Sequence, residues 1–168
     1  MKISFEQYVL NNISEKTIVI SCKDSYFINS FIENPNIILC TFFGNILQSP
    51  KGIDLEYFKY CITDEEAENI LVIGHYRCDS LQFLQKSKPR NVVWKEAEKH
   101  LNNLDNNPFK RINSSNHYKQ MVWLNTIQQI LKISEMDFFK REKINIKGLI
   151  IDEIKNYSVS EINLKTIL

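Results

Sequence analysis

The 168-residue sequence has no excess charge of either sign and no long apolar run. Its 21 lysine and arginine residues nearly balance 20 aspartate and glutamate residues, which leaves a formal net charge of +1. Basic stripes with interleaved aromatic residues are also lacking, so neither nucleic acid nor an anionic membrane surface is an expected partner. No apolar stretch approaches the roughly 20 residues that are needed to span a bilayer, so no membrane-spanning helix is expected.

The N-terminus lacks the features of a secretory signal peptide, because polar residues and Glu6 fall within its first turns. The chain also lacks a Cys-x-x-Cys pair, which makes a thiol redox function the least favoured class. We therefore expect a cytoplasmic protein with reduced thiols. Cys40 and Cys61 lie among apolar residues and are expected to be small buried side chains without a chemical role.

No internal repeat and no linker divides the chain, so we expect a single domain over residues 1–168. Two runs, 17–21 and 70–74, are apolar throughout and rich in Val and Ile. Such runs are typical of strands that are buried on both faces of a parallel sheet. Helical patterns alternate with them, which predicts an α/β fold with a central, mostly parallel sheet flanked by helices.

The remaining elements follow from periodicity and from Pro, Gly and Asn positions. Further strands are predicted at 36–43 and 144–151, with a weak edge strand at 157–164. Helices are predicted at 5–13, 24–33, 53–61, 64–69, 92–104, 117–133 and 135–141. The span 102–116 is rich in Asn and Ser and is predicted to be a loop.

Four side chains that bind metals follow the two buried runs. Cys22 and Asp24 come after residues 17–21, and His75 and Cys78 come after residues 70–74. Ligands of open parallel sheets bind beyond the carboxyl ends of the strands, so we expect these four side chains to converge. Two thiols, an imidazole and a carboxylate are a donor set typical of Zn²⁺. A single His-x-x-Cys is weak evidence, but its pairing with a second motif predicts a zinc site.

These residues and spacings resemble the β-class carbonic anhydrases. Residues 22–24 and 74–78 are similar to the family's Cys-x-Asp-x-Arg and His-x-x-Cys motifs. Residues 43–46, Phe-Gly-Asn-Ile, are similar to its Ala-Gly-Asn segment, and residues 146–152 resemble its late strand with Gly and Asp. The resemblance extends from about residue 17 to residue 164.

The resemblance implies a β-carbonic-anhydrase-like fold in which Cys22, His75 and Cys78 bind Zn²⁺. It implies reversible hydration of CO₂ to bicarbonate through a zinc-bound hydroxide, with Asp24 as the catalytic residue that orients it. Two thiolates donate more charge than imidazoles, so we expect activity to favour alkaline pH. CO₂ and bicarbonate are the implied small-molecule partners, and a homodimer is the implied assembly.

The sequence departs from the family pattern at Tyr26, which stands where the family has an arginine. In the family this arginine pairs with the aspartate and keeps it off zinc, whereas a phenol offers one neutral donor. Asp24 is therefore freer to become the fourth zinc ligand, a closed form that family members adopt as an inactive state. Lys23 or Arg77 could supply the missing charge, although a solvated side chain is the favoured interpretation of each.

A second departure is Asp79, which follows the last expected ligand where the family usually has Gly. It either adds negative charge beside the thiolates or, as we favour, caps a helix that begins near Ser80. His100 and His117 are expected to be exposed, with a proton-shuttle role as the alternative.

Three functions remain open from the sequence. The first is carbonic anhydrase activity, and the second is a non-catalytic zinc-binding domain with Asp24 as fourth ligand. The third is hydrolysis of another small linear molecule, carbonyl sulfide or carbon disulfide, which is chemistry also found in this fold family. An open fourth coordination position separates the first and third from the second.

Overall fold

The computed structural model describes residues 4–28, 33–47, 53–86, 99 and 117–162. In this part of the chain, five strands form one sheet in the order β2-β1-β3-β4-β5. Four of them run parallel, and β5 pairs with β4 in the antiparallel sense. The strands are β1 (Thr17–Cys22), β2 (Ile37–Phe42), β3 (Asn69–His75), β4 (Asn145–Asp152) and β5 (Ser158–Ile162). The predicted α/β fold with a mostly parallel sheet is confirmed.

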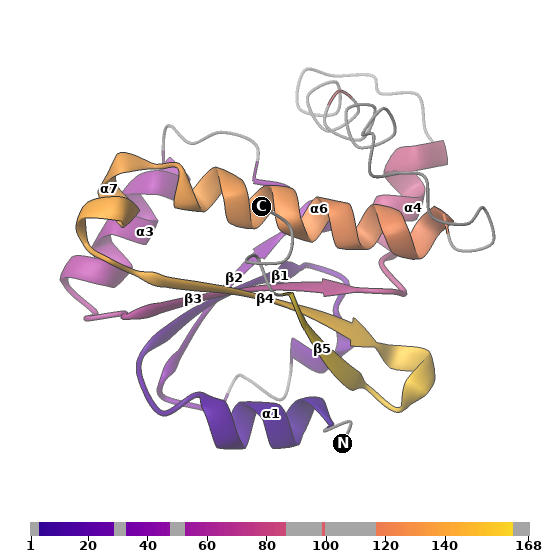
Figure 1. Ribbon diagram of the computed structural model, residues 1–168, viewed down its shortest axis with the longest axis horizontal. Coiled ribbons are helices and arrows are strands. Elements are labelled where there is room, and N and C mark those ends of the chain that lie inside the picture. The colour runs from indigo at the N-terminus through magenta and orange to yellow at the C-terminus, as the bar shows by residue number, and fades with distance from the viewer. Residues whose placement is uncertain (1–3, 29–32, 48–52, 87–98, 100–116, 163–168) are drawn as a thin grey trace.

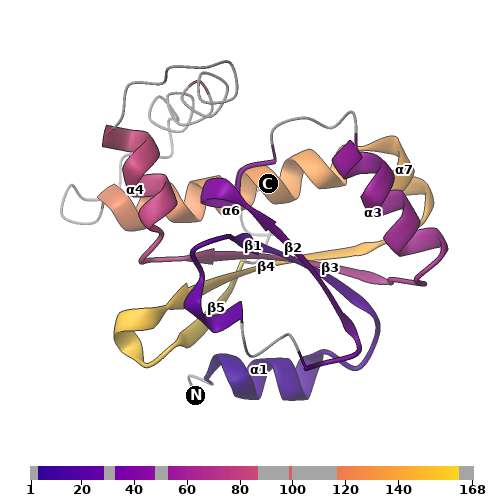
Figure 2. The same cartoon turned by 180° about the vertical axis from the view of Figure 1, so that it is seen from behind.

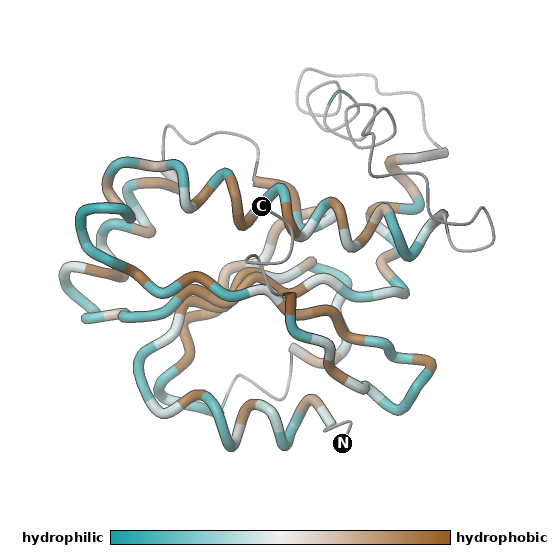
Figure 3. Tube along the Cα trace, in the orientation of Figure 1, coloured by the Kyte–Doolittle hydropathy of each residue, from teal (hydrophilic) through white to brown (hydrophobic). Residues whose placement is uncertain are grey.

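The two apolar runs form the centre of the sheet. Every residue of β1 is buried, and in β3 only Asn69 is partly exposed. Figure 3 shows hydrophobic residues concentrated along these strands, between the more polar helices. Because successive side chains of a strand point to opposite faces, β1 contributes Ile18 and Ile20 to one core and Val19 to the other.

Helices cover the two faces of the sheet unequally. Figures 1 and 2 place α3, α4, α6 and α7 on one side, which we call the α6 face, and α1 on the other side, which we call the α1 face. The helices of the α6 face are α3 (Ile53–Thr63), α4 (Asp79–Lys86), α6 (His117–Ser134) and α7 (Asp137–Arg141). None of the helices in the described ranges is long and apolar enough to cross a membrane.

Helix α1 (Phe5–Asn12) starts with a capping box. The Ser4 hydroxyl accepts a hydrogen bond from the Gln7 amide N–H, and the Gln7 side chain accepts one from the Ser4 N–H. Phe5, Tyr8 and Val9 then face the sheet and are buried. One short helix therefore supplies the helical cover of the α1 face within the described residues.

Helix α6 packs closely against β3 and β4. A Cβ atom added at Gly74 would collide with the Thr126 hydroxyl, and one added at Gly148 would collide with the end of Ile130. These two glycines allow the backbone of the sheet to approach the helix.

Buried polar side chains of α6 hold the turn that follows β2, in which residues 43–45 form the 3₁₀ helix η2. Asn125 donates to the Gly44 carbonyl at 3.0 Å, and Gln129 accepts from the Leu47 N–H at 3.0 Å. Gly44 and Asn45 both have positive φ, 64° and 54°. The turn predicted at these two residues is confirmed.

The helix predicted at 64–69 is wrong. Helix α3 ends at Thr63, the Ala67 N–H bonds to the Cys61 carbonyl at 3.0 Å, and Asn69 already begins β3. Glu66 has φ 57°, a left-handed conformation that ends a helix and turns the chain. The need to enter the central strand overrides the helix propensity of this acidic segment.

Other predicted elements agree with the structure to within a few residues. The segment predicted as a helix at 24–33 contains a 3₁₀ turn, η1 (Tyr26–Ile28), in its described part. The predicted edge strand is β5. The predicted helix at 92–104, the predicted loop at 102–116 and the side chains of His100 and His117 lie outside the described residues.

Candidate metal centre

Strands β1 and β3 are neighbours, and the four candidate ligands lie at their carboxyl ends. Cys22 is the last residue of β1 and His75 is the last residue of β3. Cys22 shares the α6 face with Ile20, whereas His75 follows Gly74, which faces α6, and therefore points to the α1 face. Asp24 and Cys78 follow within three residues, so the group spans the edge of the sheet from both faces.

The ligand atoms of these four side chains lie within 4.8 Å of one another. The two sulfur atoms, of Cys22 and Cys78, are 3.4 Å apart. Asp24 Oδ1 is 3.0 Å from His75 Nε2 and 3.8 Å from Cys78 Sγ. The edges of a tetrahedral zinc site with such ligands are about 3.3 to 3.8 Å. Donor types and spacing both fit a tetrahedral metal ion, as the sequence predicted.

The start of α4 holds the Asp24 carboxylate. Asp24 Oδ2 accepts hydrogen bonds from the Ser80 N–H at 2.7 Å and from the Ser80 hydroxyl at 3.0 Å. These bonds leave Oδ1 facing His75 and Cys78. The role of Ser80 was not predicted, because a serine beside a helix start resembles an ordinary cap.

The residues considered as substitutes for the family arginine do not take that role. Lys23 and Arg77 are exposed, and neither forms an ion pair with Asp24 among the described residues. The side chain of Tyr26 is also largely exposed, at 73%. Asp79 is the exposed first residue of α4, where a negative charge is favourable at a helix N-terminus.

The second ring nitrogen of His75 has its own partner. His75 Nδ1 lies 2.9 Å from Oε1 of Glu153, the residue that directly follows β4. The Arg77 backbone N–H donates to Glu153 Oε2 at 2.7 Å. The sequence analysis noticed the strand that ends at Asp152 but missed Glu153, because a single acid after a strand carries no distinctive spacing.

Hydrogen bonds within the group shift the pKa of each member when no metal is bound. The Cys78 thiol lowers the pKa of Cys22 to about 6, against the effect of burial. The same contact and burial raise the pKa of Cys78. Burial opposes protonation of His75, but its bonds to Asp24, Cys22 and Glu153 raise its pKa to about 11. Burial would likewise raise the pKa of Asp24, but bonds from His75 and Ser80 hold it well below its usual range.

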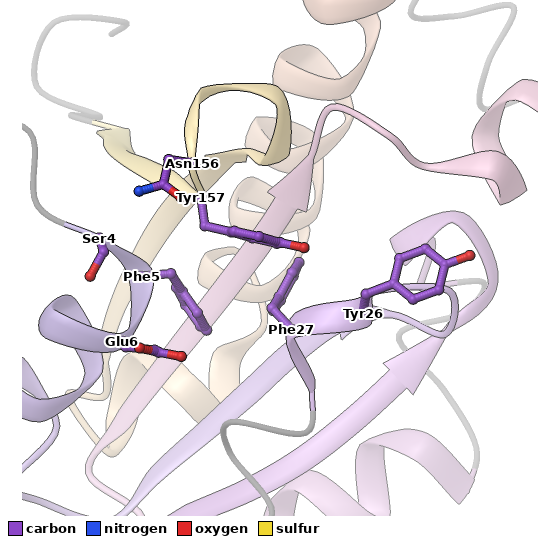
Figure 4. Close-up of a pocket in the computed structure, with 7 residues that line it drawn as sticks. All are labelled: Ser4, Phe5, Glu6, Tyr26, Phe27, Asn156 and Tyr157. Carbon is purple, nitrogen blue, oxygen red and sulfur yellow. The ribbon is translucent and has the colours of Figure 1, made fainter.

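A cavity of about 450 Å³ lies on the α1 face close to this group. Figure 4 shows the lining residues, which come from the start of α1, from η1 and from the turn before β5. Phe27 lines the cavity and also packs edge-on against His75, with ring centroids 5.8 Å apart. None of the four candidate ligands lines the cavity, so it borders the candidate metal centre through Phe27.

Comparison with known proteins identifies the family. A family model described as carbonic anhydrase matches residues 17–155. The structure is similar to wild-type β-carbonic anhydrase CafD of Aspergillus fumigatus, with a TM-score of 0.74 and 15% identity over 97% of this chain and 98% of that one. No curated protein sequence matches the chain.

Two further solved structures show the same fold. Coccomyxa β-carbonic anhydrase in complex with acetazolamide has a TM-score of 0.72 and 17% identity, over 93% of this chain and 75% of that one. A tetrameric β-carbonic anhydrase of Sordaria macrospora has a TM-score of 0.71 and 15% identity, over 95% and 86%. Since the family model spans most of the chain and the fold agrees throughout, the protein belongs to the carbonic anhydrase family and has the fold of its β class.

Proposed function

We propose that the protein catalyses the reversible hydration of CO₂ to bicarbonate with a Zn²⁺ ion held by Cys22, His75 and Cys78. The observation that carries this proposal is the convergence of two sulfur atoms, one imidazole nitrogen and one carboxylate oxygen within 4.8 Å. Membership of the carbonic anhydrase family supports the substrate. The likeness to solved structures supports the fold on which the site is built.

A zinc ion at this site supplies a Lewis acid that lowers the pKa of a bound water from 15.7 toward about 7. Cys22 and Cys78 are buried, so the protein keeps their sulfur atoms away from bulk solvent. Two thiolates neutralise the charge of the ion more fully than imidazoles do, which makes the water less acidic. The hydration rate should therefore rise with pH.

Asp24 controls access to the fourth coordination position in this proposal. Its Oδ1 lies close enough to His75 Nε2 and Cys78 Sγ to act as a fourth ligand. Turnover requires this oxygen to withdraw, after which it can accept a hydrogen bond from water and orient it. Ser80 anchors Oδ2 and so limits how far the carboxylate moves.

The same position of Asp24 favours a second candidate function, a non-catalytic zinc-binding domain. Four protein ligands make a closed site, and closed zinc sites are structural. Within the described residues Asp24 has no arginine or lysine partner that would draw it away. The two candidates share all their ligands and differ in whether Asp24 leaves the metal.

Stopped-flow CO₂ hydration by the zinc-loaded protein, over about pH 6.5 to 9, separates these candidates. The expected result is a rate well above buffer that rises with pH, with one zinc ion per chain. Absence of any rate at this zinc content supports the non-catalytic domain. If the same sample hydrolyses carbonyl sulfide instead, the substrate assignment is wrong while the metal site is retained.

The variant Tyr26→Arg tests whether the missing arginine limits the rate. A guanidinium at this position is expected to pair with Asp24 and favour the open site. A charged hydrogen bond contributes about 1.5 to 3 kcal/mol, which corresponds to a rate increase of about 10- to 100-fold if opening is limiting. Tyr26→Phe is the matched control, since it changes the side chain without adding charge. Equal rates in both variants would show that Asp24 is not the obstacle.

The remaining proposals concern the whole chain. We propose that residues 1–168 form one domain, that the protein is cytoplasmic and that it assembles as a homodimer or larger homo-oligomer. The tetrameric state given for the Sordaria macrospora enzymes supports an oligomer. Light scattering of the purified protein measures the assembly, and a monomer at all concentrations would contradict it.

A further inference from the structure

Glu153 makes the most informative contact that lies outside the four candidate ligands. It is the first residue of the 3₁₀ helix η5 (Glu153–Lys155), immediately after β4, and its side chain is only 4% exposed. Burying a carboxylate is costly unless hydrogen-bond donors satisfy its oxygens. The two oxygens of Glu153 meet this requirement with partners from one short segment, residues 75–77.

The partners of Glu153 lie on both sides of the proposed ligand His75. Oε1 is 2.9 Å from His75 Nδ1, and Oε2 accepts the Arg77 N–H at 2.7 Å. Strand β4 pairs with β3, with Ile151 opposite His75, and the Tyr76 N–H bonds to the Ile151 carbonyl at 3.1 Å. The end of β4 therefore fixes both the ring of His75 and the backbone that leads to Cys78.

The orientation of the His75 ring decides which nitrogen can bind metal. Nε2 faces Asp24 Oδ1 at 3.0 Å, within the candidate metal centre, while Nδ1 faces Glu153 on the other side. The ring is 1% exposed and packs edge-on against Phe27, so it has no room to turn over freely. A carboxylate that accepts from Nδ1–H leaves the Nε2 lone pair free for the ion and makes it more basic.

We propose that Glu153 is a positioning residue that holds His75 in the Nδ1–H form and so tightens metal binding at Nε2. This inference rests on the proposed zinc site, but it is independent of whether CO₂ is the substrate. Outer partners of metal-binding histidines contribute about 10- to 100-fold to metal affinity. A contact that served only to pair buried charges would not have this effect on affinity.

The test compares zinc affinity, by chelator competition, in wild type, Glu153→Gln and Glu153→Ala. Glu142→Gln is the matched control, because Glu142 is exposed and lies just before the opposite end of β4. Glu153→Ala should weaken zinc binding by about 10- to 100-fold. Glu153→Gln, which has nearly the same shape, has one carbonyl oxygen for two N–H donors and should lose less. It also retains the test if the alanine variant fails to fold.

A spectroscopic signature completes the experiment. In ¹⁵N-edited spectra of the zinc-loaded wild type, His75 is expected to show a slowly exchanging Nδ1–H and a metal-bound Nε2. The chain has three histidines, so the signals are few. Glu153→Ala should accelerate exchange of this proton with solvent. Affinity within twofold of wild type in both variants, or zinc on Nδ1, would overturn the inference.

The outcomes also separate this inference from the proposed function. If wild type binds zinc and the Glu153 variants bind it equally well, the inference fails and the proposed function stands. If the variants lose affinity but wild type does not hydrate CO₂, the proposed function fails and the inference stands. If wild type binds no zinc, both are wrong.

Discussion

The two faces of the sheet differ in how completely they are covered. On the α6 face, Ile18, Ile20 and Ile130 are fully buried, and two glycines bring the sheet against the helix. On the α1 face a short helix leaves a cavity of about 450 Å³, with Tyr26 exposed at its rim. The candidate metal centre draws on both environments. The sealed face supplies the sulfur atoms of Cys22 and Cys78, and the open face supplies His75.

This difference suggests a division of labour within one site. Thiols are protected where water and oxidants are excluded, because their reactivity follows exposure and thiolate character. The polar groups, Asp24 and Glu153, instead lie around the imidazole. Removing a ligand from either face is the strongest way to test whether both halves are needed.

Cys22→Ser is expected to have the largest effect. Loss of one thiolate ligand should weaken zinc binding by more than about 100-fold, beyond the range given for outer partners. His75→Ala should cause a loss of similar size from the other face. Cys40→Ser is the matched control, since Cys40 is a buried cysteine in β2 that lies outside the candidate group. Zinc content by mass spectrometry and chelator competition measure the effect, and unchanged affinity in Cys22→Ser would remove the sulfur half from the site.

The second prediction concerns protons that zinc displaces. Without metal, the raised pKa of His75, about 11, and the raised pKa of Cys78 leave both groups protonated between about pH 7 and 9. The pKa of Cys22, about 6, leaves it already deprotonated. Metal ligands must lose their protons, so binding releases about two protons and affinity rises about 100-fold per pH unit.

Calorimetry in buffers of different ionisation enthalpy measures the number of protons released. A release near zero across this pH range would mean that the histidine and the second thiol are already deprotonated in the free protein. The expected sign follows from competition: raising the pH removes protons from His75 and Cys78, and so favours the ion.

The smallest expected effect compares the packing of the two faces directly. Gly74→Ala places a methyl group against the Thr126 hydroxyl of α6 and should lower the free energy of unfolding by about 1 to 3 kcal/mol. Tyr26→Trp adds volume at the cavity rim and should change it by less than about 0.5 kcal/mol. Urea denaturation monitored by circular dichroism measures both values. Equal costs would show that the α1 face is as tightly packed as the α6 face.

The sequence was sufficient to find the four candidate ligands, because each follows a strand whose apolar run marks it as central. Cys22 and His75 end those strands, and the parallel pairing of β1 with β3 brings them together. The supporting residues could not be found in this way. Ser80 and Glu153 are common residues at the starts of short helices, and their partners, Asp24 and His75, are more than 50 positions away along the chain.

Local propensity was a poor guide where the chain turns into the sheet. Residues 64–69 are rich in helix-forming acids, yet Glu66 takes a left-handed conformation so that Asn69 can pair with β1 and β4. The gain from completing a buried strand outweighs the small preference of each residue. Predictions from periodicity were accurate for long apolar elements and failed at this short polar connection.

The separation of the two cysteine ligands has a consequence for the order of folding. Cys22 and Cys78 are 56 positions apart, so an unfolded chain must close a long loop, at an entropic cost, before one ion can contact both. Pairing of β1 with β3 supplies that closure. Uptake of zinc during refolding should therefore follow assembly of the central strands, and its rate would report when this part of the sheet has formed.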